Sequence, residues 1–276
     1  MYTIHKPLYL SAYDHPDIYP GPAPEKSYLY MNGSIYFLQG TKDLSTLSVV
    51  INRKRIKLNE LLRKHGAASI EERYPILSYG SNACLAQLKH KYQSESKAGN
   101  LLINLRGEIS ETDVVYSSTI TRYGAIPATL APMKGAKCQV WLSLLDENQF
   151  KHMIQTEKPY SLALSTAKKL HLENGIRPSC YYAFLYNQVL SVEGSLFRYP
   201  DIPASESIAI QVWQAHMLMF ISSLFKMEKK RFIQKVKTND RFRGKVFKAL
   251  QRFAKPVKWD DWQKVDKVLT WKESKN

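Results

Sequence analysis

The segment from Pro75 to Tyr92 constrains the fold most, because its pattern changes character twice within a few residues. Its first five residues, PILSY, are a short apolar run of the kind found in buried strands. The next three, Gly80, Ser81 and Asn82, are turn-forming residues that interrupt the run at once. Residues 83–92 then have a helix-forming composition with apolar side chains on one side. The sequence therefore predicts a strand, a tight polar turn and a helix.

A turn of this kind is suited to holding an anion. The first backbone N–H groups of a helix have no partner within the helix and can bind a carboxylate. Gly80 lets the backbone approach a ligand closely, and Ser81 and Asn82 add side-chain donors. The same two side chains could instead serve only as caps of the following helix, and the residues alone leave both interpretations open.

The segment ILSYGSNACLAQL resembles the hallmark of the γ-glutamyl cyclotransferase family, whose first barrel strand ends in a Tyr-Gly-Ser-Asn loop before a helix. Tyr79, Gly80, Ser81 and Asn82 match this loop. The family continues with a strand, a small-residue segment ending in proline and a glycine turn, similar to VVYSSTITRYGAIPATLAPMKGAK here. A further strand and an acid-capped helix follow, similar to CQVWLSLLDENQFKHMIQTE, and they place Glu157 at the family's catalytic position.

The resemblance spans roughly Tyr74 to Leu190 and implies an α+β fold with a mixed, largely closed small β-barrel and short helices. We expect three parts. Residues 1–70 form an N-terminal extension, residues 71–200 the barrel, and residues 201–276 a basic helical C-terminal region.

The resemblance also implies a reaction. The α-amine of a small γ-glutamyl substrate attacks its own γ-carbonyl, which forms 5-oxoproline and releases an amine or amino acid without a cofactor. Because the nucleophile is tethered to its electrophile, such a lyase or transferase site has mainly to orient and deprotonate it.

Three groups would share this chemistry. The loop from Tyr79 to Asn82 would hold the substrate. Glu157, at the end of a helix with an apolar face, would be a partly buried general base, since burial can raise the pKa of a carboxyl group toward neutrality. A solvated glutamate paired with Lys158 is the alternative, and Glu193 is a second candidate base. Tyr123 and Tyr160 are candidate oxyanion donors, or simply packing residues.

Other segments have recognisable patterns. Asn32-Gly33 between two β-favouring runs predicts a hairpin, Leu47–Ile51 predicts a strand and Leu58–His65 a short helix. We expect strands at 114–120 and 137–145 separated by a turn-rich stretch, and a short helix from Asp146 to Thr156 opened by Asp146 as its N-cap. Residues 180–185 and 188–192 are predicted to pair with each other.

The formal charge of +16 is concentrated at the C-terminus, where residues 226–276 hold 17 lysines and arginines against six acidic residues. Basic residues interleaved with aromatic ones suit nucleic acid or an anionic surface, although they also suit a solvated helical face. The second functional hypothesis is therefore a catalytically inactive barrel scaffold. Its basic C-terminal region would bind nucleic acid, an anionic surface or a protein partner.

The remaining features bound the class of protein. The start of the chain has no basic segment followed by an apolar run, so we expect no secretory signal. Three widely spaced cysteines indicate a reducing compartment, which favours a cytoplasmic protein. The seven histidines lack metal-ligand spacing, so no metal site is expected. The apolar stretch 208–227 contains polar side chains that are costly in lipid, so we expect a buried helix and no transmembrane segment.

Overall fold

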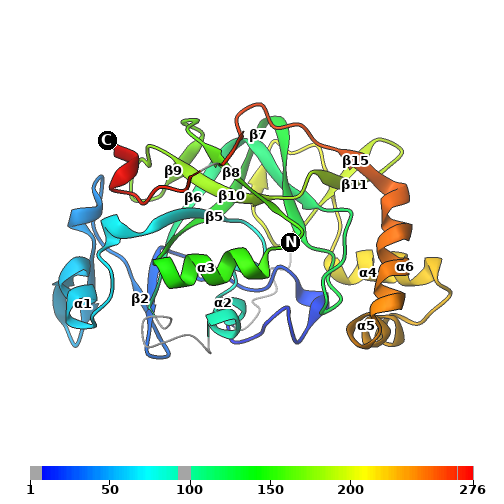
Figure 1. The fold of residues 1–276 in the computed structure, drawn as a ribbon, viewed down its shortest axis with the longest axis horizontal. Helices are drawn as coiled ribbons and strands as arrows, with labels where there is room; N and C mark the ends of the chain where they lie inside the picture. Colours follow the sequence, from blue (N-terminus) through cyan, green and yellow to red (C-terminus); the bar gives the residue numbers. More distant parts are fainter. Residues whose placement is uncertain (1–7, 93–100, 266, 276) are drawn as a thin grey trace.

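The computed structural model describes residues 8–92, 101–265 and 267–275. It is an α+β structure whose 14-stranded mixed sheet curls into a half-barrel (Figure 1). The main path through the sheet runs β15 (Ala254–Pro256), β11 (Gln188–Val192), β12 (Ser195–Arg198), β6 (Leu101–Tyr116), β7 (Ala128–Leu145), β5 (Tyr74–Ser78), β10 (Tyr181–Leu185), β8 (Ser161–Ser165), β16 (Gln263–Lys264).

Shorter strands join this path at its sides. They are β1 (Tyr28–Met31), β2 (Ser34–Phe37), β9 (Leu170–Leu172), β13 (Ala204–Ser205) and β14 (Ile210–Gln211). A separate hairpin consists of β3 (Ser48–Ile51) and β4 (Lys54–Lys57). The helices are α1 (Leu58–Lys64), α2 (Leu85–Tyr92), α3 (Glu147–Thr156), α4 (Gln214–Leu224), α5 (Lys229–Thr238) and α6 (Asp240–Leu250).

The predicted α+β class is confirmed, but the sheet is less closed than expected. The path of hydrogen-bonded strands has two ends, β15 and β16, in the described part of the chain. Both end strands come from residues after 250, so the C-terminal segment supplies the two edge strands of this path. The sheet is therefore a curled half-barrel.

The β6–β7 hairpin is the longest pairing, with strands of 16 and 18 residues. Its register shifts between Ser110 and Thr112, and Pro132 lies opposite Thr112 beside this irregularity. The predicted turn-rich stretch up to residue 135 is therefore wrong from Ala128 onward. Pro132 and Gly135 are tolerated in β7 because the register shift disrupts the regular pattern of hydrogen bonds between the strands.

Both faces of the central strands are buried. Along β10, Tyr182 and Phe184 join a hydrophobic cluster with residues of α2 and α3, while Tyr181, Ala183 and Leu185 join the larger cluster on the other face. Side chains of a strand alternate between faces, so this segment must be apolar throughout. Helices α2 and α3 thus cover one side of the sheet.

The pairing predicted between residues 180–185 and 188–192 is wrong. Both runs are strands, but β10 lies between β5 and β8, and β11 pairs with β12 and β15. Because both edges of β10 are already occupied, the chain leaves at Tyr186 and joins another part of the sheet.

The N-terminal predictions are confirmed locally. β1 and β2 form a hairpin around Asn32 and Gly33, which have positive φ values of 49° and 83°. β1 also pairs with β6, so this hairpin extends the main sheet.

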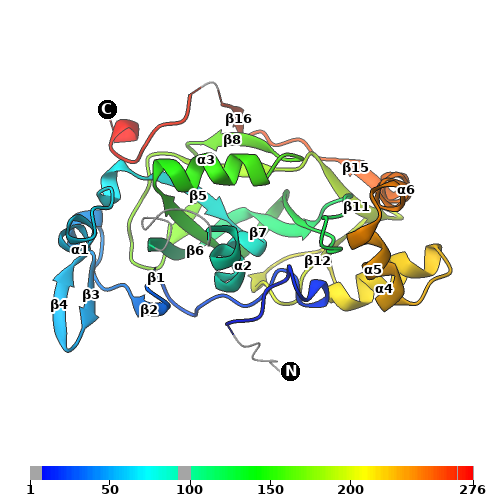
Figure 2. The ribbon, with the colours of Figure 1, turned by 60° about the horizontal axis from the view of Figure 1, so that its bottom comes forward.

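The expected helix over 208–227 is shorter, since α4 covers only Gln214–Leu224. Helices α4, α5 and α6 gather at one end of the molecule, at the right of Figures 1 and 2. The expected helical segments after residue 250 are wrong. The described residues there form only single 3-10 turns and short strands, and Trp271 is buried among them. Within the described ranges, no helix has the length and apolar character needed to cross a membrane.

A buried ion pair links β12 to β6. Arg198 Nε lies 2.7 Å from Asp113 Oδ2, and both side chains are almost completely buried. Arg198 also donates to the carbonyl of Ile202 at 2.6 Å, and Asp113 accepts from the amide of Val114 at 2.7 Å. The pair is thus fully surrounded by hydrogen-bonding groups.

We predict that Asp113→Ala destabilises the protein by about 3–5 kcal/mol, because the Arg198 charge is left buried without its partner. Urea unfolding measures this loss. The double variant Asp113→Ala/Arg198→Met should lose less than the single variant, since it removes the unpaired charge. Equal or greater loss in the double variant would contradict the argument.

Candidate functional site

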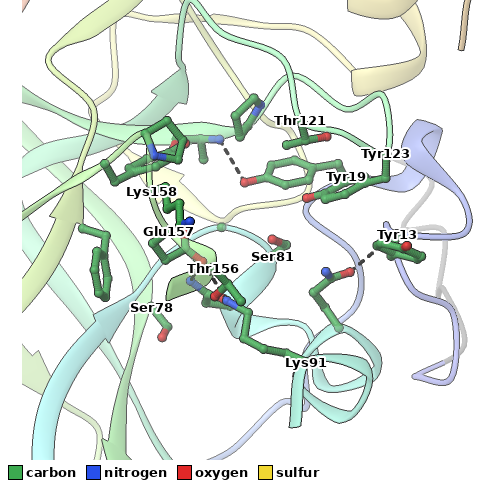
Figure 3. A pocket seen from close by; sticks show the side chains of 18 of the residues that line it. Tyr13, Tyr19, Ser78, Ser81, Lys91, Thr121, Tyr123, Thr156, Glu157 and Lys158 are labelled. Carbon is green, nitrogen blue, oxygen red and sulfur yellow. Dashed lines mark hydrogen bonds and ion pairs between the residues drawn. The ribbon is translucent and has the colours of Figure 1, made fainter. Parts of the chain in front are cut away.

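A cavity of about 800 Å³ opens at the carboxyl end of β5 (Figure 3). Its walls come mainly from five parts of the chain: the loop after β5, helix α2, the loop between β6 and β7, the end of α3 and the N-terminal segment. The lining residues include Tyr13, Tyr19, Tyr79, Gly80, Ser81, Asn82, Lys91, Tyr123, Ala128, Glu157 and Tyr160.

The loop after β5 forms one wall. Ser81–Ala83 is a single 3-10 turn, closed by hydrogen bonds from the Ala83 amide to the Gly80 carbonyl (2.9 Å) and from the Cys84 amide to the Ser81 carbonyl (3.0 Å). The helix α2 therefore begins at Leu85, two residues later than predicted. Tyr79 donates its hydroxyl hydrogen bond to the carbonyl of Phe184 in β10, so this hydroxyl ties the loop to the sheet.

Only glycine fits at position 80, because a tyrosine from the N-terminal segment packs directly against it. A Cβ atom on Gly80 would lie 2.5 Å from the Tyr19 hydroxyl oxygen. That oxygen accepts a hydrogen bond from the Ala128 amide at 2.9 Å and also interacts with Ser81. The close approach puts the Tyr19 hydroxyl beside the loop.

The opposite wall is the C-terminal end of α3. Asp146 caps this helix through a capping box with Gln149, as the sequence predicts. The helix ends before Lys158-Pro159, and the Tyr160 amide donates to the Glu157 carbonyl at 2.8 Å. Proline cannot continue the helix, and Glu157 is the C-cap residue directly after Thr156.

Glu157 meets the loop through two hydrogen bonds to the same oxygen. Asn82 Nδ2 donates to Glu157 Oε1 at 3.1 Å, and Lys91 Nζ lies 2.7 Å from that oxygen (Figure 3). Lys91 also donates to Asn82 Oδ1 at 2.7 Å. The Lys91 and Glu157 side chains are 8% and 18% exposed, so a partly buried Asn82–Lys91–Glu157 cluster lies in the cavity wall.

The N-terminal segment closes a further side of the cavity. The Tyr13 ring lies 4.1 Å from the ring of His90 in α2 and 5.6 Å from that of Tyr123. Gln87 accepts hydrogen bonds from the Ser11 hydroxyl (2.9 Å) and the Tyr13 amide (3.1 Å). From the other side, Lys229 of α5 forms an ion pair with Asp17 at 2.9 Å. The segment is therefore held between α2 and α5.

Tyrosines dominate the inner surface, and burial keeps them protonated. Desolvation raises the pKa of Tyr19 to about 12, although hydrogen bonds from Ala128 and Ser81 oppose the shift. Burial also raises the pKa values of Tyr79 and Tyr160 well above 10, with smaller contributions from nearby tyrosines and Glu157. All three hydroxyls stay neutral hydrogen-bonding groups at physiological pH.

The cavity brings together all five residues singled out from the sequence, namely Tyr79, Gly80, Ser81, Asn82 and Glu157. Glu157 is partly buried, and its cation partner is Lys91 where the sequence suggested Lys158. Tyr123 and Tyr160 also line the cavity, but the Tyr160 hydroxyl donates to the Ala128 carbonyl at 2.8 Å. Glu193 lies in the exposed turn between β11 and β12, outside the cavity.

Sequence reasoning missed Tyr19 and Lys91. Tyr19 lies in the proline-rich segment that precedes the resemblance, and nothing local connects it to a loop 60 residues later. The sequence does contain a signal that could have identified Lys91. This residue follows Asn82 by nine residues on the predicted helix, and a lysine there can reach back to a preceding polar loop.

Comparison with known proteins gives a distant likeness to solved structures. No protein-family model matches the chain, and no curated protein matches it. A solved structure described as "Gamma-glutamyl cyclotransferase" is similar to it, with 11% sequence identity and a TM-score of 0.35. The match covers 64% of this chain and 99% of that chain. A likeness at this level carries no argument about activity, which must come from the site itself.

We predict that stability falls as the pH rises from about 10 toward 12. The unfolded chain loses its tyrosine protons near pH 10, whereas Tyr19 keeps its proton until about pH 12 in the folded protein. Each such tyrosine then costs about 1.4 kcal/mol per pH unit. Ultraviolet absorbance of tyrosinate, measured alongside circular dichroism, should show these groups ionising only as the protein unfolds. Their complete ionisation near pH 10 in a folded protein would contradict this.

Proposed function

We propose that this chain is a γ-glutamyl cyclotransferase-like enzyme that converts a γ-glutamyl group to 5-oxoproline and releases an amine or amino acid. The observation that carries the proposal is the convergence of Glu157 with the Tyr79–Asn82 loop in one cavity. Asn82 Nδ2 lies 3.1 Å from Glu157 Oε1. Two separate sequence motifs, 75 residues apart, thus supply adjacent groups of a single site.

The main catalytic group that the proposed reaction needs is a general base. The substrate's α-amine, once deprotonated, attacks the γ-carbonyl carbon, so that a new C–N bond closes a five-membered lactam. The bond from that carbon to the leaving nitrogen breaks, and this nitrogen takes up a proton. One proton of the α-ammonium is released to solvent before the attack. Glu157 is suited to take the second proton, which the attacking nitrogen loses as it becomes the lactam N–H, and to give it to the leaving nitrogen.

Lys91 and the loop suit the substrate's α-carboxylate. The Lys91 ammonium lies in the cavity wall between Asn82 and Glu157, where it provides a positive charge in a partly buried setting. Charge-assisted hydrogen bonds in such a setting are stronger than neutral ones. A carboxylate bound there would place the neighbouring α-ammonium toward Glu157.

Tyr19 is better suited than Tyr79 or Tyr160 to hydrogen-bond a developing oxyanion. The hydroxyls of Tyr79 and Tyr160 donate to backbone carbonyls of the sheet. The Tyr19 oxygen instead accepts the Ala128 amide and lies beside Ser81 in the cavity wall, and in the proposed mechanism its own proton serves the substrate. Its raised pKa keeps that proton in place at neutral pH.

The test is to incubate the protein with γ-glutamyl dipeptides and γ-glutamyl amines and to measure 5-oxoproline by mass spectrometry. Glu157→Gln should reduce kcat by about 10²–10⁴-fold, because the amide cannot accept the proton. Glu193→Gln is the matched control, since this glutamate lies in a turn outside the cavity, and it should retain full activity. No product from any substrate, with the protein folded, would favour the inactive scaffold. A fully active Glu157→Gln would overturn the role of the base.

We further predict that Lys91→Met lowers kcat/KM by about 10–100-fold, since the substrate carboxylate and Glu157 both lose their cation. The double variant Lys91→Met/Glu157→Gln should lose less than the product of the two single losses, because the part of the Lys91 contribution that acts through Glu157 is already gone. Steady-state kinetics of the four proteins measures this coupling. Fully multiplicative losses would show that Lys91 acts independently of Glu157.

A further inference from the structure

The outer face of α4 is exposed and carries no charged side chain. The helix sequence, QAHMLMFISSL, contains no lysine, arginine, aspartate or glutamate. Met219, Phe220 and Leu224 are 54%, 41% and 45% exposed. The opposite side of the helix supplies the residues that pack into the molecule, among them Met217, Leu218 and Ile221. The large apolar side chains of the outer face therefore remain about half exposed to solvent.

This apolar face lies within a strongly cationic part of the chain. Residues 226–255 hold 12 lysines and arginines and only two acidic residues, Glu228 and Asp240. Glu228 is engaged as the cap of α5, where it accepts the amides of Lys230 and Arg231, and Asp240 pairs with Arg243. Exposed members of the basic set are Lys226, Lys230, Arg231, Lys235, Arg241, Lys245, Lys248, Arg252 and Lys255.

Basic residues border the apolar face at two places. The Phe220 ring lies 5.9 Å from the ring of Phe253, which stands between the exposed Arg252 and Lys255 in sequence. At the other place, Leu224 is followed two residues later by the exposed Lys226. Helices α4, α5 and α6 lie together at one end of the molecule (Figure 2).

We propose that α4 and its basic border form a docking surface for anionic lipid bilayers, on which the protein binds peripherally. Large apolar side chains at a helix surface can enter the boundary between headgroups and acyl chains, while lysine and arginine attract anionic headgroups. Exposed clusters of apolar side chains mark interaction sites in general, and the positive border selects a negatively charged partner. Nucleic acid would use the charges but leaves Met219 and Leu224 without a role, since aliphatic side chains offer no stacking surface.

The experiment is sedimentation of the full chain with vesicles of phosphatidylcholine, alone or mixed with phosphatidylserine. We expect binding to the mixed vesicles that weakens as salt is raised, with little binding to phosphatidylcholine alone. Met219→Glu/Leu224→Glu should weaken binding by at least about tenfold, because charges replace the side chains that enter the bilayer. Both positions are exposed, so the fold should persist, which circular dichroism checks.

The matched control is Ile154→Glu, at an apolar residue of α3 whose exposed fraction, 44%, is close to the 45% of Leu224, and which lies outside helices α4–α6. It adds negative charge without touching the proposed surface and should bind nearly as well as the natural sequence. Absence of binding to mixed vesicles, or equal binding by the α4 double variant, would overturn the proposal. Tight binding to a single-stranded oligonucleotide that the α4 double variant retains would assign the surface to nucleic acid instead.

Discussion

The antiparallel pairing of β5 with β7 determines where the candidate site forms. Tyr74, the first residue of β5, lies opposite Leu145, the last residue of β7, so α3 begins beside the start of β5. α3 has 10 residues and β5 has five. The helix spans about 15 Å and the strand about 17 Å, so the helix returns along the strand and ends near its carboxyl end. Glu157 therefore meets the loop that follows β5.

The parts of the chain outside the family resemblance also meet at this cavity. The N-terminal segment contributes Tyr13 and Tyr19 to its lining, and α5 holds that segment through the ion pair between Lys229 and Asp17. Lys237 also reaches the Tyr13 and Asp14 carbonyls at 3.4 Å. Helix α5 thus supports the cavity indirectly, by holding the N-terminal segment in place. The lipid-binding role is proposed for the outer face of α4 and is separate.

Local patterns in the sequence were sufficient to predict the elements that carry the site. The change from PILSY to a polar turn fixed the strand and loop, and Asp146 with Gln149 fixed the start of α3. Strand partners could not be predicted in the same way. β10 pairs in parallel with β5, about 100 residues earlier, and this depends on the fold as a whole and leaves no local signal.

The same distinction separates the site residues. Asn82 and Glu157 belong to local motifs that the family resemblance places in order. Tyr19 reaches the loop because the N-terminal segment is held between α2 and α5, and the glycine at position 80 makes room for its hydroxyl. A residue of this cavity can thus be predicted from the sequence when it belongs to a local motif. It cannot be predicted when only contacts with distant parts of the chain bring it there.

A crystal structure of the protein soaked with 5-oxo-L-proline, the proposed product, tests the central claim most directly. The account predicts that the product carboxylate binds beside Lys91 and the Gly80–Asn82 loop, with the lactam facing Glu157. An empty cavity at saturating product, or product bound elsewhere on the molecule, would contradict it.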